Sequence, residues 1–150
     1  MIIQLRKINQ GNYMECLKLK VASHQDTFVA LNWFSLIQAK YETDLYPLGI
    51  YKNNKMIGFI LYDFDEDIMK WSMSRFMIDD KYQKQGLGKI ALGEFIKYFY
   101  AKHGKLTLYT SANVDNLSTI NLYEKFGFIK ENIFEYEKDG IKYKEYRMKL

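Results

Sequence analysis

The sequence predicts a single α/β (α+β) domain spanning residues 1–150, built on a mixed, mostly antiparallel sheet of about seven strands with helices on both faces. Three observations favour this fold class. Runs with strand-like alternation recur along the chain, segments with helical spacing separate them, and glycine, asparagine or aspartate marks most junctions. The expected order is strand, helix, helix, three strands, helix, strand, helix and two strands.

The first segments predict a strand and two helices. Ile2–Ile8 alternates apolar and polar residues, as a half-buried strand does. Apolar residues at helical spacing then predict one helix from Tyr13 to about Ser23 and another over Leu36–Tyr41. Because proline disrupts a helix, Pro47 is expected to close the second helical segment.

The middle of the chain predicts three strands and an acidic turn. Leu48–Tyr51 and Met56–Tyr62 are rich in β-forming residues and are expected to form a hairpin across residues 52–55. A turn crowded with carboxylates follows, and Met69–Ile78 is the next expected strand. The acids of this turn are Asp63, Asp65, Glu66 and Asp67.

A long helix and a short strand are expected next. From Gly86 onward, apolar residues at three- and four-residue spacing define a helix with one buried face, and Gly104 ends it. Leu106–Tyr109 is short and apolar, which predicts the strand that follows.

The C-terminal part predicts a helix and a hairpin. An amphipathic helix over Leu117–Lys125 ends at Gly127, because glycine commonly terminates helices. Two long strands, Phe128–Lys138 and Ile141–Leu150, complete the chain. The Asp-Gly pair at 139–140 between them is a strong hairpin pattern.

Composition excludes several classes of protein. Twenty-two Lys and Arg residues against 18 Asp and Glu leave a net charge of +4 without a basic stripe, which argues against a nucleic-acid partner. Cys16 is the single cysteine, so we expect no disulfide framework, no cysteine metal site and a reducing cytoplasmic location. The N-terminal segment does not resemble a signal peptide, and no apolar run reaches membrane-spanning length.

The segment from Gln83 to Lys89 is the strongest candidate for a binding site. Two glycines at a helix start let backbone N–H groups approach an anion, which the helix dipole also attracts. Flanking side chains supply two positive charges and two neutral donors, so we expect a diphosphate cradle. An ordinary loop and helix cap would look similar. The segment consists of Gln83, Lys84, Gln85, Gly86, Leu87, Gly88 and Lys89.

Two other phosphate-binding patterns fit less well. Gly86, Gly88 and Ala91 match the spacing of the Rossmann dinucleotide pattern, but residues 79–85 separate them from the preceding strand. The next strand also lacks the acid that would bind a ribose at its tip, residues 109–111. The Walker P-loop pattern is missing from the chain.

The chain resembles the GNAT superfamily of N-acetyltransferases over nearly its whole length. Gln83, Gly86 and Gly88 match that family's [QR]-x-x-G-x-[GA] motif at the start of a long helix. A second motif, N-x-x-A-x-x-x-Y-x-x-x-G-F, is matched one helix later except that threonine replaces its alanine. Lys84 also stands where the family often has glycine. The matched residues of the second motif are Asn116, Tyr123, Gly127 and Phe128.

The resemblance implies that acetyl-CoA is the cosubstrate and that no metal is needed. Its diphosphate would lie on the backbone of residues 83–89, and its pantetheine arm would run along the strand end. In that family this strand commonly splays from its neighbour across a bulge. Asn116 would hold the arm from the far side, although it also suits a helix N-cap. The residues of the strand end are Phe76, Met77 and Ile78.

The resemblance also assigns Tyr123 as the catalytic acid that protonates the departing CoA thiolate. The alternative is a core aromatic packed beside Leu122 and Phe126. The base that deprotonates the amine stays unassigned, because this chain has Ser74 or Arg75 where some polyamine-acetylating relatives carry an acid.

The acceptor is expected to be a small-molecule amine. Bacterial spermine/spermidine (diamine) N-acetyltransferases are resembled by this chain in residues 23–47, Gly58, Phe59 and the acidic turn. The carboxylates of the acidic turn, and those near the end of the second helix, would also attract a polycation. A solvated turn is the alternative. The expected substrate-binding acids are Glu42, Asp63, Asp65 and Glu66.

Three questions stay open at this point. The acceptor could instead be an antibiotic amine or a protein N-terminus, and the domain could be a non-catalytic CoA-binding sensory module. The alternating residues 135–137 suit either a homodimer edge or a wall of the acceptor site.

Overall fold

The computed structural model describes residues 2–22 and 31–150, and the order of its elements matches the prediction. The seven strands are β1 (Ile3–Lys7), β2 (Leu45–Lys52), β3 (Lys55–Asp65), β4 (Lys70–Ile78), β5 (Leu108–Asn113), β6 (Ile129–Lys138) and β7 (Ile141–Lys149). The helices are α1 (Tyr13–Leu17), α2 (Asn32–Tyr41), α3 (Leu87–His103) and α4 (Leu117–Lys125), with a short 3-10 turn, η2 (Asp80–Tyr82). Among the described residues, no helix is long and apolar enough to cross a lipid bilayer.

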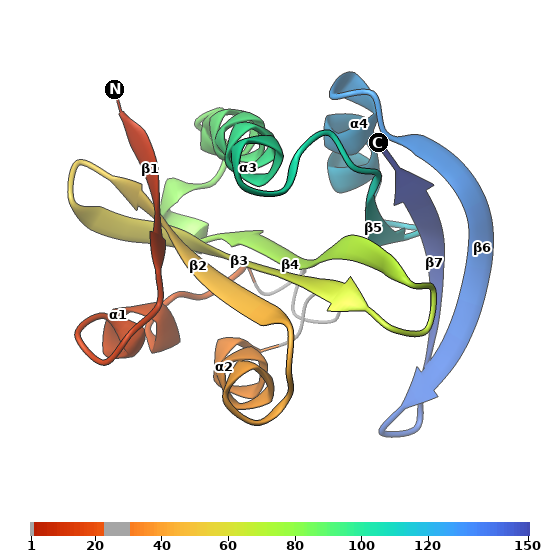
Figure 1. Ribbon diagram of the computed structural model, residues 1–150, viewed down its shortest axis with the longest axis horizontal. Helices are drawn as coiled ribbons and strands as arrows, with labels where there is room; N and C mark the ends of the chain where they lie inside the picture. The colour runs from red at the N-terminus through yellow and green to blue at the C-terminus, as the bar shows by residue number, and fades with distance from the viewer. Residues whose placement is uncertain (1, 23–30) are drawn as a thin grey trace.

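All seven strands form one sheet in the order β1-β2-β3-β4-β5-β7-β6. Only the β4–β5 pair is parallel, so the predicted mixed, mostly antiparallel sheet is confirmed. Figure 1 shows α3 and α4 on one face of the sheet and α1 and α2 on the other. The predicted fold class is therefore correct.

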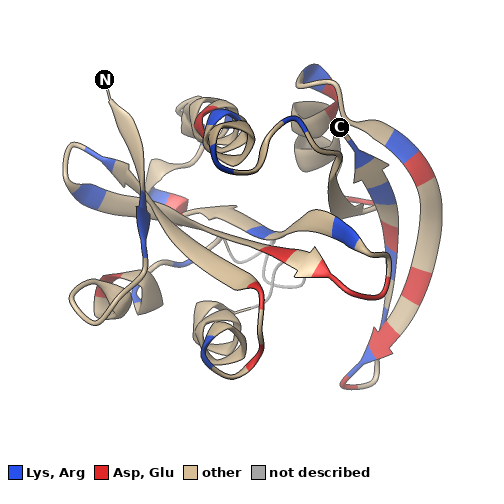
Figure 2. Cartoon of the chain, in the orientation of Figure 1, with Lys and Arg blue, Asp and Glu red and all other residues tan. Residues whose placement is uncertain are grey.

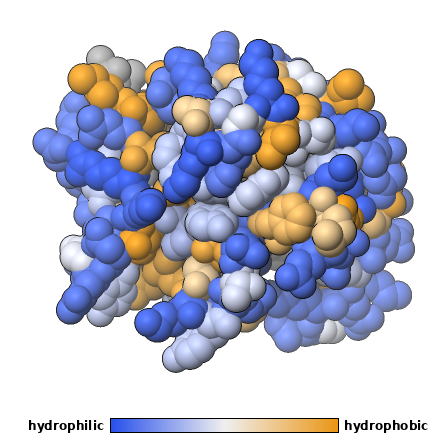
Figure 3. Space-filling model, in the orientation of Figure 1, coloured by the Kyte–Doolittle hydropathy of each residue, from blue (hydrophilic) through white to orange (hydrophobic). Residues whose placement is uncertain are grey.

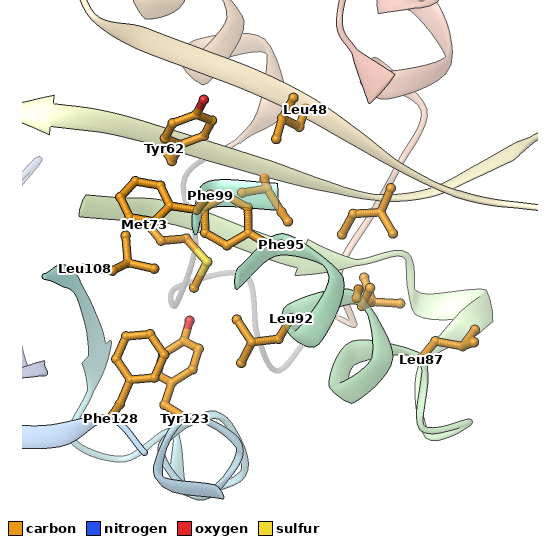
Figure 4. Packing of buried hydrophobic residues seen from close by; sticks show 14 of the residues in the cluster. Leu48, Tyr62, Met73, Leu87, Leu92, Phe95, Phe99, Leu108, Tyr123 and Phe128 are labelled. Atoms are coloured by element: carbon orange, nitrogen blue, oxygen red, sulfur yellow. The ribbon is translucent and has the colours of Figure 1, made fainter. Parts of the chain in front are cut away.

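Each face of the sheet buries its own hydrophobic core. The larger core packs α3 and α4 against the sheet around Tyr62, Phe95 and Phe99 (Figure 4). The smaller core, on the opposite face, contains Cys16 and Phe59 and is covered by α1 and α2. The outer surface seen in Figure 3 is mainly hydrophilic with dispersed apolar side chains, as expected for a folded globular domain.

A bulge and a split in the sheet occur together on β4. The pairing of β3 with β4 steps from Leu61↔Arg75 to Tyr62↔Met73, which leaves Ser74 as an extra residue. The pairing of β4 with β5 ends at Met73↔Thr110. Beyond that point the two strands diverge, and within the described residues one edge of β4 from Ser74 to Ile78 has no neighbouring strand. The expected splayed strand is present.

Several predicted boundaries were wrong. Pro47 lies inside β2 and does not close a helix. The pairing of β2 with β1 ends at Leu48, so the missing N–H group of Pro47 costs no hydrogen bond to β1. The helix α1 ends at Leu17, well before the predicted end near Ser23, a residue outside the described part of the chain. The strand β5 starts at Leu108 and runs to Asn113, later than predicted.

The acidic turn is also shorter than predicted. Asp63 and Asp65 belong to β3, and the turn itself covers residues 66–69. Asp63 is buried, and the hydroxyl of Ser74, on the neighbouring strand, donates a 2.5 Å hydrogen bond to its carboxylate. This cross-strand partner is not visible in the local sequence.

Candidate active site

A cavity of about 1250 Å³ lies where β4 and β5 diverge. Its walls come from the end of β4, the start of α3, one face of α4, and β5. The β6–β7 hairpin and α2 extend it on the opposite side of the split. The cavity therefore has two arms, one beside α3 and α4 and one beside α2 and the β6–β7 hairpin.

The first arm contains the predicted anion cradle. Gly86 caps α3 with φ +76°, a left-handed conformation that favours glycine. The first helical hydrogen bond is donated by the N–H of Ile90 to the carbonyl of Gly86, at 3.4 Å. The N–H groups at the helix start therefore remain available to an anion at the positive end of the helix dipole.

Gly88 keeps the cradle open. A Cβ atom at this position would meet only Ile78 Cγ1 at 3.8 Å and Leu122 Cδ2 at 3.9 Å, which is ordinary contact. Protein packing therefore does not require glycine here. Its missing side chain instead leaves space between β4 and α4, along the wall of the cavity.

Positive side chains surround this arm. Lys84, Lys89 and Lys125 all line the cavity, and each is exposed at its mouth. Lys84 has φ +61°, a left-handed conformation that favours glycine, which explains why the family often has glycine at this position. The lysine adopts this conformation with local backbone strain. Charge and free N–H groups both favour a polyphosphate ligand in this arm.

The loop before the cradle is fixed by side-chain hydrogen bonds. Gln83 Nε2 donates to the carbonyl of Ile78 at 2.8 Å, which ties the loop to the end of β4. Asp79, which is buried, accepts hydrogen bonds from the backbone N–H groups of Lys20 and Lys81, both at 3.0 Å. The cradle is thus held in place before any ligand arrives.

Asn116 and Tyr123 come from α4. The side chain of Asn116 accepts a hydrogen bond from the N–H of Thr119 at 3.4 Å, so it is the N-cap of the helix, and it also lines the cavity. Tyr123 is 4% exposed and packs beside Phe128, with ring centroids 5.4 Å apart (Figure 4). It belongs to the core and lines the cavity as well, so the two interpretations of this residue are compatible.

The environment of Tyr123 keeps its phenol protonated. Burial raises its pKa to about 12, and the charge of Glu145 acts in the same direction, whereas the hydroxyl of Thr110 opposes them. Thr110 itself donates a 2.9 Å hydrogen bond to the carbonyl of Met73 at the apex of the split. A protonated donor is thereby placed next to the point where β4 and β5 separate.

The second arm contains a guanidinium among carboxylates. Arg75 lines the cavity, and its guanidinium donates to the carbonyl of Ser74 at 2.9 Å and to Gln38 Oε1 at 3.3 Å. Burial lowers its pKa, whereas the charges of Asp63, Glu145 and Glu42 raise it. These carboxylates therefore lie close enough to act on one cation.

The predicted substrate acids lie beside this arm without lining it. Burial raises the pKa of Asp63 to about 6, and the negative charges of Asp65 and Glu42 contribute in the same direction, so these three acids are brought together. Figure 2 shows acidic residues gathered after α2 and at the β3–β4 turn, where Glu66 is exposed. Their role in substrate binding stays a prediction.

The β6–β7 hairpin forms one wall of the cavity, of which the sequence interpretation offered only residues 135–137 as a possible part and missed Glu145. Five residues from the hairpin line the cavity, and Glu145 is the only carboxylate among the described lining residues. Ser111 Oγ donates to Glu145 Oε1 and Tyr136 Oη donates to Glu145 Oε2, both at 2.9 Å. The five residues are Phe134, Tyr136, Lys138, Tyr143 and Glu145.

The structure brings nearly all predicted cofactor residues to the cavity. Gln85 is the exception, since its side chain is exposed and donates to the carbonyl of Lys81 at 3.3 Å. The predicted residues that line the cavity are Phe76, Met77, Ile78, Gln83, Lys84, Gly86, Leu87, Gly88, Lys89, Asn116 and Tyr123.

Comparison with known proteins agrees with this geometry. The model of the acetyltransferase (GNAT) family matches residues 5–128. A spermine/spermidine N(1)-acetyltransferase of Bacillus subtilis is 28% identical over 152 residues, covering 97% of this chain and 99% of the relative.

Solved structures show the same fold in enzymes with different acceptors. A spermidine N-acetyltransferase from Vibrio cholerae, in complex with CoA and spermine, superposes with a TM-score of 0.72 at 17% identity, over 99% of this chain and 94% of that one. The ribosomal-protein-S18-alanine N-acetyltransferase of Escherichia coli gives 0.74 at 20% identity, over 99% and 93%. The fold alone therefore does not choose between a polyamine and a protein N-terminus.

A split sheet beside a helix-capped anion cradle defines the class of acyl-CoA-dependent N-acyltransferases. Because the family model covers most of the chain, this protein belongs to the GNAT family and is an N-acetyltransferase.

Proposed function

We propose that this enzyme transfers acetyl from acetyl-CoA to a primary amine of a polyamine such as spermine or spermidine, directly within a ternary complex. The observation that carries the proposal is the two-armed cavity: the cradle and Tyr123 lie in one arm, and carboxylates gather around the other. The similarity to the spermine/spermidine N(1)-acetyltransferase of Bacillus subtilis supports the same acceptor class.

Acetyl-CoA fits the first arm. The N–H groups between Gly86 and Lys89 would bind its diphosphate, and Lys84 and Lys125 would offset the remaining phosphate charge. The free edge of β4 would pair with the amides of the pantetheine arm, as an added strand does. This places the thioester near the apex of the split, between Met73 and Tyr123.

Transfer requires an amine nucleophile and an acid for the leaving thiolate. The amine nitrogen attacks the thioester carbonyl, a C–N bond forms, and the C–S bond breaks. The phenol of Tyr123, protonated across the physiological range, donates its hydrogen to the developing thiolate. Because a thiolate is a weaker base than this phenolate, the hydrogen bond itself supplies much of the stabilisation.

A polyamine suits the second arm. Its chain is apolar between ammonium groups, and the arm combines aromatic walls with nearby acids. Asp63, Asp65 and Glu42 would hold a distal ammonium beyond Arg75, with Glu66 at the exposed turn.

A panel of initial rates tests this proposal. CoA release from acetyl-CoA would be followed with spermine, spermidine, a short diamine, an aminoglycoside and a peptide with a free N-terminal alanine. We expect the polyamines to give the highest kcat/KM. Higher efficiency with the peptide or the aminoglycoside would reject the polyamine acceptor, and acetyl-CoA binding without turnover of any amine would indicate a sensory module.

A further inference from the structure

We propose that Glu145 is the carboxylate that receives the acceptor amine and takes its proton, with Tyr136 and Ser111 as its positioning residues. This inference rests on the proposed function and supplies the base that the sequence left unassigned. It depends on the geometry of the β6–β7 hairpin.

The register of the hairpin builds one face toward the cavity. Tyr136 pairs with Tyr143, and Phe134 pairs with Glu145, so alternation places all four side chains on the same side of the two strands. The Tyr136 and Tyr143 rings stack with centroids 5.0 Å apart, and Phe134 stacks on Tyr136 at 6.0 Å. A carboxylate beside stacked aromatic rings is suited to bind an alkylammonium group.

Glu145 lies between the two arms. It lines the same cavity as Tyr123 on α4 and Arg75 on β4, and its charge raises the pKa of both groups. Both of its oxygens accept 2.9 Å hydrogen bonds, from Ser111 and Tyr136, which orient the carboxylate. Carboxylate oxygens retain further lone pairs for an ammonium donor.

An aromatic ring in this arm already binds an ammonium group. Lys138 Nζ lies 4.5 Å from the centroid of the Phe34 ring, and both residues line the cavity. This contact shows that the apolar wall accommodates an alkylammonium side chain.

The proton balance of the step is complete. The ammonium passes one proton to Glu145, which turns the ion pair into two neutral groups. The free amine then attacks the thioester. As the C–S bond breaks, the protonated amide nitrogen gives its second proton to the Tyr123 oxygen while Tyr123 passes its own proton to the thiolate, so no free phenolate forms. Glu145 then releases its proton, so one proton is released per transfer.

Glu145→Gln tests the inference, with the best amine of the panel as substrate. The amide retains an acceptor for Tyr136 or Ser111 but takes no proton. We expect kcat/KM for the amine to fall about a hundredfold or more at neutral pH, while the Kd for acetyl-CoA stays unchanged. The rate of the variant should then rise about tenfold per pH unit as free amine accumulates, whereas the wild type stays flat over the same range.

The charged and titratable groups on the side of Glu145 are Arg75, Tyr123, Tyr136, Tyr143 and Arg147, whose guanidinium lies over the ring of Phe134. Tyr136→Phe therefore serves as a second variant that keeps the carboxylate; we expect a smaller loss with the flat pH profile retained. Glu131→Gln, an exposed charge change on the same hairpin outside the cavity, is the matched control and should behave as wild type.

The outcomes separate the two proposals. Wild-type kinetics and an unchanged pH profile in Glu145→Gln would overturn the role of Glu145 and leave the acetyltransferase function intact. Turnover of only a non-polyamine amine would reject the polyamine acceptor, while the variant would still report on Glu145 with that amine. Failure of the wild type to acetylate any amine would overturn both.

Discussion

Thr110 and Met73 are joined at the point where the sheet divides: the buried hydroxyl of Thr110 donates a 2.9 Å hydrogen bond to the carbonyl of Met73. This is the last registered pair between β4 and β5. The bond therefore fixes the apex of the cavity.

Thr110→Val should destabilise the protein by about 1 kcal/mol or somewhat more, because a buried carbonyl loses its donor without a change in side-chain volume. Urea unfolding would measure the difference. Thr107→Val, at an exposed position just before β5, is the control. Equal unfolding free energies for the two variants would show that the apex bond does not hold the split.

Gly88→Ala should weaken the binding of acetyl-CoA without lowering the stability of the protein. Alanine is favoured over glycine in a helix by about 1 kcal/mol, and its Cβ meets only ordinary contacts here, so the melting temperature should stay the same or rise. The affinity for acetyl-CoA should fall about tenfold or more, since the methyl group enters the cradle wall. Calorimetric titration measures this; Gly93→Ala, on the same helix outside the cavity, should bind normally.

Tyr123→Phe should lower kcat about a hundredfold or more and leave the Kd for acetyl-CoA unchanged, because it removes only the proton donor. Since burial raises the pKa of Tyr123 to about 12, the wild-type rate should show no loss from its ionisation up to about pH 10. Tyr100→Phe on α3 is the control. A wild-type kcat in Tyr123→Phe would remove the assigned role.

Asp63 should make stability depend on pH. Burial raises its pKa from 3.8 to about 6, so the folded state binds the proton more tightly than the unfolded state. The free energy of unfolding of the wild type should therefore fall relative to Asp63→Asn as the pH rises from about 4 to about 6, by about 2 kcal/mol after allowance for solvent screening. Asp67→Asn, at the exposed turn, should parallel the wild type; parallel curves for Asp63→Asn would contradict the prediction.

Local patterns predicted the backbone features of the first arm well. The left-handed backbone of Gly86 and the capping role of Asn116 depend on neighbours within a few residues, so short motifs contain the necessary information. Pro47 was misplaced because β2 accommodates a proline only beyond the end of its pairing with β1. That end depends on residues about 40 positions away in the sequence, which a local pattern does not contain.

The acceptor arm was harder to predict, because its residues meet only through the sheet. Asp63 is buried and bonded to Ser74 on another strand, and no local pattern distinguishes it from the exposed acids of the turn. Glu145 lies among lysines and an arginine that suggest a solvated strand. The Asp-Gly turn does fix the pairing of Lys138 with Ile141. Continuing that register along the two strands pairs Glu145 with Phe134, on the same face of the hairpin as Tyr136.

The most direct test of acetyl transfer to a polyamine is mass analysis of spermidine after incubation with the purified protein and acetyl-CoA. We expect spermidine to gain one acetyl group in proportion to the CoA released, and Gly88→Ala to form the same product only at higher acetyl-CoA concentration. Release of CoA without acetylated spermidine, or intact acetyl-CoA after prolonged incubation, would contradict this function.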